Sequence, residues 1–286
     1  MFVFKAAVVG AGTMGGEIAQ VIANADIPVV LKDVDERFVE QGLDKARSLW
    51  QARVDAGKLT AEEHERKLAL IAGTTQYDSF GDVDFVIEAV PERIEIKQSV
   101  FAELDEVTPG HAILASNTSS LSVTEMAQAT GRPDKVVGFH FFYPASVMRL
   151  IEVIEGEDTS PETAQAAVSF AQAIRKAPIR CGEAPGFVVN RILIPVLNDA
   201  VRVLDEGVAS PEDIDKGMRL GTNWPIGPLA LIDLIGIDTY VHVCEALWKS
   251  IREERFAPPP TLVQMLDEGR LGRKSGRGFF EYAAAA

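Results

Sequence analysis

The feature that most constrains the fold is a glycine-rich segment near the N-terminus, Gly10-Ala11-Gly12-Thr13-Met14-Gly15. It follows an apolar, β-prone run at residues 2–9 and leads into an apolar helical pattern at residues 18–25. A second strand pattern then ends at Asp33, about twenty positions further on. Strand, glycine turn, helix, strand and acidic residue, in this order, are typical of a dinucleotide-binding βαβ unit.

The three glycines have separate tasks in such a turn. Gly10 permits the tight turn, Gly12 lets backbone amides approach a pyrophosphate, and Gly15 lets the helix pack closely on the strand. The helix N-terminus then faces the phosphates. Asp33 is expected to bind the ribose 2′-hydroxyl and to repel a 2′-phosphate, which favours NAD over NADP. The alternative is a glycine-rich turn in another kind of α/β protein.

Composition narrows the class of partner. The 286 residues suffice for one large domain or two ordinary ones, and the net charge of −14 argues against nucleic acid and anionic membranes. Cys181 and Cys244 form neither a disulfide framework nor a metal-ligand spacing. The sequence shows no signal peptide and no uncharged stretch long enough to span a bilayer. We therefore expect a cytoplasmic protein with no metal.

A helical hairpin is predicted after Asp33. Residues 36–56 have a helical pattern that breaks at Gly57, and Thr60 with Glu63 forms a capping box that opens a second helix. The hairpin is rich in basic residues for so acidic a chain: Lys45, Arg47, Arg53, Lys58, Arg66 and Lys67. They form either a ligand-binding face or a solvated face with ion pairs to Asp44, Asp55 and Glu62.

Further strands are predicted at residues 83–90 and 112–115, and polar residues follow them. Because ligands of open parallel sheets bind beyond the carboxyl ends of the strands, Asp33, Glu92, Ser116 and His140 are expected to share one site. For Ser116 the alternative is a plain turn before a helix capped by Ser122.

His140 and Glu152 lie in two apolar runs that flank a Tyr-Pro-Ala-Ser break, which predicts strand, turn and strand. If the second run folds back on the first, the carboxylate reaches the imidazole, fixes its tautomer and stabilises its charged form. That pair has the outline of a general base. The alternative is a core histidine with its own partners and an edge-strand glutamate facing water.

The second half of the chain reads as helical. The best boundary lies in Gly182–Gly186, so we expect a Rossmann-type domain with a mostly parallel sheet over residues 1–183 and an all-α domain over residues 184–286. Residues 188–206 are apolar nearly all round, which predicts a buried helix. Its one odd polar residue, Asn190, needs partners, and the alternative to a site role is a helix cap or a structural amide. A helical core of this small size rarely buries all of its apolar faces by itself. We therefore expect a homodimer that forms through this domain. The chain ends in four alanines, to which we assign no function.

These pieces resemble one family, the NAD-dependent (S)-3-hydroxyacyl-CoA dehydrogenases, which include 3-hydroxybutyryl-CoA dehydrogenases. Beyond the glycine segment, the resemblance rests on four stretches in the same order: Ala115–Ser120, Gly138–Phe142, Leu150–Val153 and Pro185–Arg191. It covers nearly the whole chain, including the closing Gly-Arg-Lys-Ser-Gly-Arg-Gly-Phe.

The resemblance implies roles for matching positions. His140 would take the proton from the 3-hydroxyl, Glu152 would orient the imidazolium, and Ser116 and Asn190 would hydrogen-bond substrate and catalytic groups. The hairpin would hold coenzyme A, with Arg53 as a basic contact. The implied NAD contacts are Gly10, Gly12, Thr13, Met14, Gly15, Asp33, Ala89, Glu92, Lys97, Ser116 and Lys274.

One departure and three alternatives remain. The family usually has Phe-Phe-Asn-Pro after the histidine, whereas this chain has Tyr143 at the asparagine position, which bears on acyl preference. An L-gulonate-type sugar-acid dehydrogenase would share the histidine–glutamate pair without needing a coenzyme A pocket. A non-catalytic, NAD-binding crystallin-like protein, or one module of a larger β-oxidation protein, would also fit.

Overall fold

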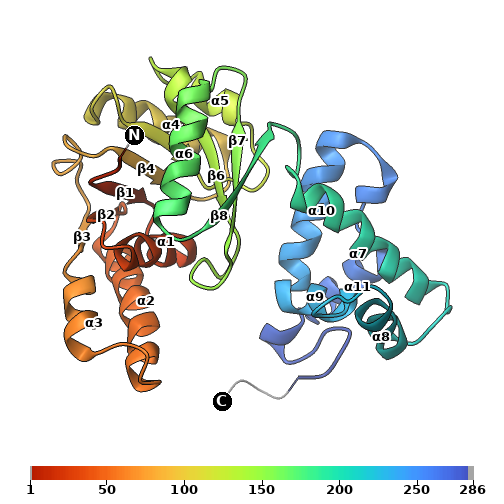
Figure 1. The fold of residues 1–286 in the computed structure, drawn as a ribbon. Helices are drawn as coiled ribbons and strands as arrows, with labels where there is room; N and C mark the ends of the chain where they lie inside the picture. Colours follow the sequence, from red (N-terminus) through yellow and green to blue (C-terminus); the bar gives the residue numbers. More distant parts are fainter. Residues whose placement is uncertain (1, 283–286) are drawn as a thin grey trace. The chain divides into compact units, whose positions relative to one another are not determined.

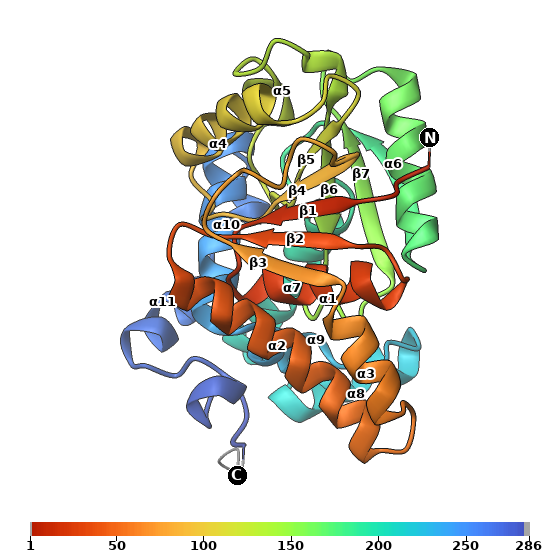
Figure 2. The ribbon, with the colours of Figure 1, turned by 90° about the vertical axis from the view of Figure 1, so that its left-hand side faces the viewer.

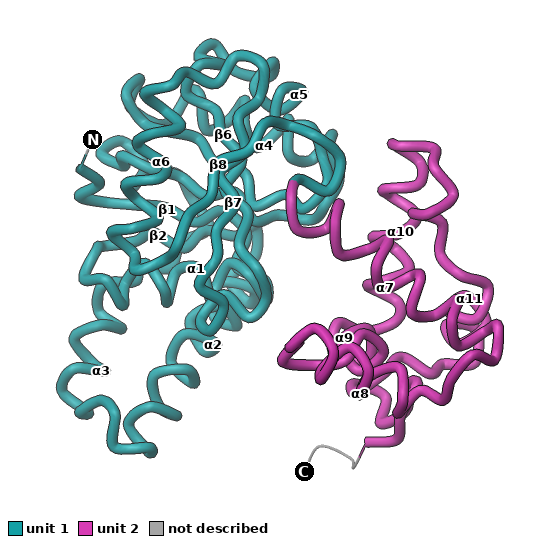
Figure 3. Tube along the Cα trace, turned by 45° about the vertical axis from the view of Figure 1, so that its right-hand side comes forward, with its two compact units in different colours: residues 1–187 teal, residues 188–286 magenta. Residues whose placement is uncertain are grey.

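The computed structural model describes residues 2–282, so Ala283–Ala286 lie outside the described residues. The chain divides into two compact units, Met1–Phe187 and Val188–Ala286 (Figure 3). The division falls four residues after the boundary expected from the sequence.

Unit 1 is built on one eight-stranded sheet in the order β3-β2-β1-β4-β5-β6-β7-β8 (Figures 1 and 2). The strands are β1 (Ala6–Val9), β2 (Val29–Lys32), β3 (Ile71–Thr74), β4 (Phe85–Glu88), β5 (Ile113–Ser116), β6 (Val136–Phe141), β7 (Leu150–Glu155) and β8 (Ala177–Gly182). All neighbouring pairs are parallel except β6 and β7, which are antiparallel. The expected mostly parallel Rossmann-type sheet is confirmed.

Each face of the sheet buries its own apolar cluster, because successive strand residues point to opposite faces. In β1, Ala6 and Val8 belong to one cluster with Ile18 of α1, whereas Ala7 and Val9 belong to the other. Helices α1 (Thr13–Asn24) and α6 (Pro161–Ala173) supply residues to the first cluster. Helices α4 (Ile94–Val107) and α5 (Val123–Ala127) supply residues to the second. Strands buried on both faces account for the continuous apolar runs in the sequence.

The predicted helical hairpin is present as α2 (Glu36–Asp55) and α3 (Ala61–Leu68) (Figure 2). The capping box holds, since Thr60 and Glu63 bond each other's backbone amides. Trp50 of α2 is fully buried and packs in the first apolar cluster, together with residues of α1. The next element is β3, a strand at the sheet edge.

Unit 2 is helical, and within its described residues the only β pairing is the isolated bridges of Arg277 with Gly272 and Glu281. Its elements are α7 (Val189–Asp205), α8 (Pro211–Gly221), α9 (Pro228–Ile235), α10 (Ile237–Ile251) and α11 (Pro260–Asp267), with short 3-10 turns at Glu254–Phe256 (η2) and Arg273–Ser275 (η3). The expected all-α domain is confirmed. The helix at residues 188–206 is less buried than expected, since Ile192 in α7 is 65% exposed.

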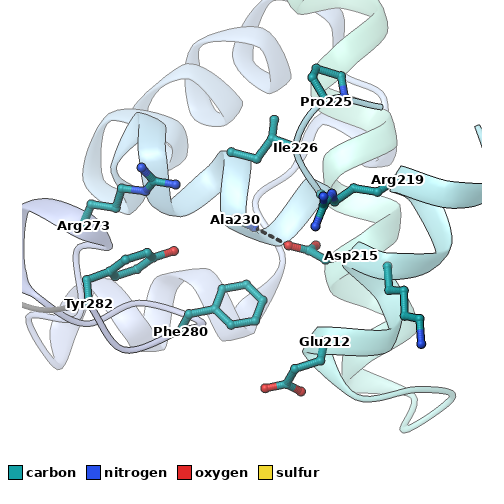
Figure 4. Close-up of a pocket in the computed structure, with 11 residues that line it drawn as sticks. Glu212, Asp215, Arg219, Pro225, Ile226, Ala230, Arg273, Phe280 and Tyr282 are labelled. Atoms are coloured by element: carbon teal, nitrogen blue, oxygen red, sulfur yellow. Dashed lines mark hydrogen bonds between the residues drawn. The ribbon is translucent and has the colours of Figure 1, made fainter. Parts of the chain in front are cut away.

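A pocket of about 420 Å³ in unit 2 shows how its helices are tied together (Figure 4). Asp215 of α8 lines it and accepts hydrogen bonds from the backbone N–H groups of Leu229 and Ala230, at 2.8 and 3.0 Å. The carboxylate therefore caps the first turn of α9. Burial raises the pKa of Asp215, against the lowering effect of the two amides.

None of the helices within residues 2–282 combines the length and the apolar run that a membrane span requires. The same residues contain no group of three or more His, Cys, Asp or Glu placed to hold a metal ion.

Candidate active site

The register of β6 and β7 forms the histidine–glutamate pair. His140 lies directly opposite Glu152 in the antiparallel ladder, and paired residues point to the same face. His140 Nδ1 lies 2.8 Å from Glu152 Oε2, and the two residues are 3% and 0% exposed. The alternative of a glutamate facing water is therefore wrong.

The partners of His140 define its tautomer. A carboxylate can only accept a hydrogen bond, so Nδ1 carries the proton in the neutral ring and Nε2 presents a lone pair. Ser119 Oγ lies 3.0 Å from that Nε2, and the hydroxyl is therefore the donor. The rings of Phe142 and Phe187 flank the imidazole, with centroids at 4.7 and 5.7 Å. In this arrangement Nε2 is the ring atom that can accept a proton.

Ser119 is a site residue that the sequence reasoning missed. It lies in the same run of hydroxyl residues as Ser116, which was preferred because it directly follows the predicted strand at residues 112–115. The structure places Ser116 elsewhere: it is fully buried, and its Oγ donates to Glu88 Oε2 at 2.7 Å.

Glu88 is a second residue that the sequence reasoning missed, and it is the centre of a buried polar network. It lies beside Ser116 in the parallel pairing of β4 and β5. Its carboxylate also accepts hydrogen bonds from Lys97 Nζ, at 2.7 and 3.0 Å, and from the Val90 amide at 2.7 Å. Lys97 is 1% exposed and Glu88 is 0% exposed. Burial of such a pair is tolerated only because each group has several partners.

Glu92 anchors the loop that carries Ser119. Its Oε1 accepts hydrogen bonds from Thr118 Oγ1 at 2.6 Å and from the Ser119 amide at 2.8 Å, and its Oε2 lies 3.2 Å from Lys97 Nζ. Burial opposes ionisation of Glu92, but the Lys97 charge and these hydrogen bonds outweigh it and hold the pKa below its usual value. An ionised Glu92 thus links the buried Lys97 to the serine beside the base.

The glycine turn fits a dinucleotide. Gly10 has φ +100°, and a Cβ there would lie 2.6 Å from the Ala89 backbone. A Cβ on Gly15 would lie 1.7 Å from the Gly10 carbonyl oxygen, so helix and strand could not approach as they do. In front of Gly12 there is open space, which leaves room for a phosphate against the helix N-terminus. Asp33 fixes the same turn, because its Oδ2 accepts a hydrogen bond from the Ala11 amide at 2.7 Å.

A basic pocket of about 450 Å³ lies in unit 1, where α1, α2, the β6–β7 connection and the α6–β8 turn meet. Four of its lining residues are cationic: Arg53, Arg149, Arg175 and Lys176. Arg53 Nη1 donates to Asn24 Oδ1, another lining residue, at 3.3 Å. Of the hairpin cations predicted from the sequence, only Arg53 lines this pocket, whereas Arg47 pairs with Asp44, and Arg66 and Lys67 pair with Asp26.

The remaining predicted site residues belong to unit 2. Asn190 is half-buried in the first turn of α7. Lys274 lies in η3, and its Nζ is 2.6 Å from Asp238 Oδ2.

A dinucleotide-binding fold with a buried histidine–glutamate pair beside the strand ends is typical of nicotinamide-dependent oxidoreductases. Comparison with known proteins narrows this class. Residues 5–184 match the family model described as 3-hydroxyacyl-CoA dehydrogenase, NAD binding domain, and residues 186–282 match that of the C-terminal domain.

Individual relatives point to the same family. A probable 3-hydroxybutyryl-CoA dehydrogenase of Deinococcus radiodurans is 44% identical over 97% of this chain and 100% of its own length. The crystal structure of Mycobacterium tuberculosis FadB2 superposes with a TM-score of 0.95 at 39% identity, covering 99% of this chain and 100% of that one. That of (S)-3-hydroxybutyryl-CoA dehydrogenase PaaH1 from Ralstonia eutropha gives 0.93 at 42% identity, with the same coverage.

The chain belongs to the 3-hydroxyacyl-CoA dehydrogenase family. It is an NAD-dependent oxidoreductase.

Proposed function

We propose that the protein interconverts (S)-3-hydroxybutyryl-CoA, or a similarly short (S)-3-hydroxyacyl-CoA, and the 3-oxoacyl-CoA, with His140 as the base. The observation that carries this proposal is the pair of contacts to one imidazole, from Glu152 to Nδ1 and from Ser119 to Nε2. The names of the similar dehydrogenases support the substrate class.

The residues of this chain perform the proton transfer. NAD, when bound, accepts the hydride that leaves C3 of the substrate. His140 Nε2 takes the proton of the 3-hydroxyl as the C3–O bond becomes a carbonyl. Positive charge then develops on an imidazole buried against Glu152, whose carboxylate stabilises it where it forms. In the reverse direction the same Nε2–H returns the proton to the oxygen.

In this proposal the substrate hydroxyl takes the place of the Ser119 hydroxyl at His140 Nε2, and Ser119 then donates to the substrate oxygen. Ser116 acts as a supporting residue through Glu88. The two serines separate in a simple experiment. Ser119→Ala should lower kcat/KM by about tenfold or more, since one hydrogen bond in the transition state is lost. Ser116→Ala should leave kcat/KM closer to that of the unmodified enzyme and lower the unfolding free energy, because it removes a buried donor from Glu88. The opposite ranking of kcat/KM would return the role to Ser116.

The cofactor site lies at the carboxyl ends of the strands, beside the glycine turn. Gly10, Gly12, Thr13, Met14 and Gly15 hold the pyrophosphate, and Asp33 binds the ribose. Ala89 borders the turn through its contact with Gly10. We assign Glu92 and Lys97 to holding the loop beside the nicotinamide site. Asn190 stays a proposed substrate contact and Lys274 a proposed NAD contact, as the resemblance implies.

The basic pocket holds the phosphates of coenzyme A. Support comes from four cations around one concave site in a chain whose net charge is −14. Arg53, the residue that the resemblance implied, is one of them. A sugar acid carries one carboxylate and no phosphate, so it does not account for four cations around one site.

We also propose a cytoplasmic homodimer that joins through unit 2 and acts in fatty-acid β-oxidation or butanoate metabolism. Support for the dimer comes from apolar side chains that unit 2 leaves uncovered, such as Ile192 and Leu220, 65% and 76% exposed. Sedimentation of the purified protein tests it.

The proposed activity is tested by rates of NADH formation with NAD. 3-Hydroxybutyryl-CoA should be oxidised with a kcat/KM at least about a hundredfold above that for L-gulonate, which lacks the coenzyme A handle. Faster oxidation of L-gulonate would favour the sugar-acid alternative, and no oxidation of either would favour a non-catalytic role.

A further inference from the structure

A buried carboxylate on α1, Glu17, has no task in dinucleotide binding. It lies just past the glycine turn and is 1% exposed. An isolated buried carboxylate is costly, so its partners indicate why it is tolerated there. Its Oε2 accepts hydrogen bonds from the amide and the hydroxyl of Ser146, at 3.1 and 3.2 Å, and its Oε1 lies 3.2 Å from Lys45 Nζ of α2.

Ser146 lies in the connection between β6 and β7, residues 142–149, which we call the 142–149 loop. A second, half-buried charge contacts the same loop. Lys176 Nζ donates to the carbonyl oxygens of Ala145 and Met148, the latter at 2.7 Å. Burial lowers the pKa of Lys176, while the negative charge of Glu17 opposes that shift. The loop is thus fastened by one carboxylate and one ammonium group.

The fastened loop forms a wall of the basic pocket. Ser146, Val147 and Arg149 line the pocket from the loop. Gln20, Val21 and Asn24 line it from α1, and Glu17 lies on the same helical face, because residues three, four and seven positions apart are neighbours on one side of a helix. Glu17 therefore joins α1 to the 142–149 loop where both line this pocket.

The catalytic pair does not depend on this fastening. His140 and Glu152 are fixed by the ladder between β6 and β7, whose last pair before the loop is Phe141 with Ile151. Removing Glu17 should free the loop between the strands while leaving the strands paired. This separates an effect on coenzyme A from an effect on chemistry.

We propose that Glu17 is a positioning residue that holds the 142–149 loop so that Arg149 and its neighbours form the coenzyme A pocket. The proposal rests on the assignment of that pocket to coenzyme A. Glu17 contacts neither the substrate nor the reacting atoms, and it acts through Ser146.

The test is steady-state kinetics of Glu17→Gln with two substrates. The amide keeps the size of the side chain and loses its charge. KM for 3-hydroxybutyryl-CoA should rise about tenfold at unchanged kcat, while KM for NAD stays constant. The N-acetylcysteamine thioester of 3-hydroxybutyrate lacks the nucleotide, so its kcat/KM should not change. A fall in kcat, an equal loss with both thioesters, or no change at all would each overturn the proposal.

Two further variants and a physical readout complete the test. Ser146→Ala removes the hydroxyl from the other side of the contact and should raise the same KM. Glu40→Gln makes the same chemical change at an exposed position of α2 and should alter neither KM. Hydrogen exchange of residues 143–149 should speed up in Glu17→Gln, and unchanged exchange there would also overturn the proposal.

The pocket assignment and the role of Glu17 fail in different ways. If Arg53→Met raises KM for the coenzyme A thioester and Glu17→Gln does not, the pocket stands and the positioning role falls. If neither variant raises it, the pocket assignment falls as well.

Discussion

The side of the sheet where β4 and β6 end, here called the catalytic edge, differs from the basic pocket in the exposure of its charged groups. Around His140, the charged groups are buried and hydrogen-bonded: Glu152 is 0% exposed, and Glu88 and Lys97 are 0% and 1% exposed. Around the pocket, Arg53, Arg149 and Arg175 are exposed and meet solvent. A proton transfer needs a fixed base in a dry setting, whereas phosphates need cations that bind and release them. The contrast predicts that changes at the edge alter rate and folding, and that changes at the pocket alter affinity.

The largest effect is expected from the base itself. His140→Gln should lower kcat by roughly 10²–10⁴, since the general base is lost. The Kd for NAD, measured by calorimetry, should stay within about twofold, because the glycine turn is untouched. Full turnover in this variant would contradict the prediction that changes at the catalytic edge alter the rate.

Lys97→Met tests whether the edge is rigid because its charges are paired. The variant leaves Glu88 buried without its ammonium partner, which should cost about 3–5 kcal/mol of unfolding free energy. Urea denaturation measures it. The double variant Glu88→Gln/Lys97→Met should lose less than the sum of the two single losses. Additive losses would mean that the two residues do not act as a pair.

Arg53→Met tests whether a change at the basic pocket alters affinity and not rate. KM for 3-hydroxybutyryl-CoA should rise by about tenfold, with kcat unchanged, because one exposed cation for phosphate is lost. The KM of the unmodified enzyme should also rise with added salt, since exposed charges are screened over about 10 Å at 0.1 M. Lys58→Met, an exposed hairpin cation outside the pocket, is the matched control and should leave KM unchanged.

A smaller effect is expected from pH at Glu92. Its pKa is lower in the folded state than its ordinary value of 4.5. Its ionised form therefore contributes stability that is complete above about pH 4.5 and is lost as the pH falls through the lower folded pKa. The difference in unfolding free energy between the unmodified protein and Glu92→Gln should shrink below that pH. A difference that stayed constant from pH 7 to pH 3 would contradict this.

Local patterns predicted much of this molecule. The glycine segment with its flanking strands and Asp33 predicted the Rossmann-type half, because Gly10 and Gly15 lie where a Cβ would clash with backbone atoms and Gly12 borders open space. The pairing of His140 with Glu152 followed from two apolar runs around a turn, which can bury their residues only by folding back on each other. Strand β3 was not predicted. Its sequence is Ile-Ala-Gly-Thr, and Ala72 and Gly73 are exposed at the sheet edge, so it lacks an apolar pattern.

The partners of charged residues were harder to predict. Lys97 was expected to contact the cofactor, and its burial against Glu88 depends on which strand end lies beside α4. Ser119 rather than Ser116 reaches the imidazole because Glu92 holds the intervening turn, a contact between residues 27 positions apart. Spacing along the chain carries no signal for either.

The central claim is that Glu152 acts through His140, and a double-variant cycle tests it most directly. The single-turnover rate of NADH formation should be measured for His140→Gln, for Glu152→Gln and for the variant with both changes. The account predicts that the double variant is no slower than His140→Gln alone, because a carboxylate without its imidazole has nothing to stabilise. If the two losses multiply, Glu152 contributes independently of His140, and the account of the pair is contradicted.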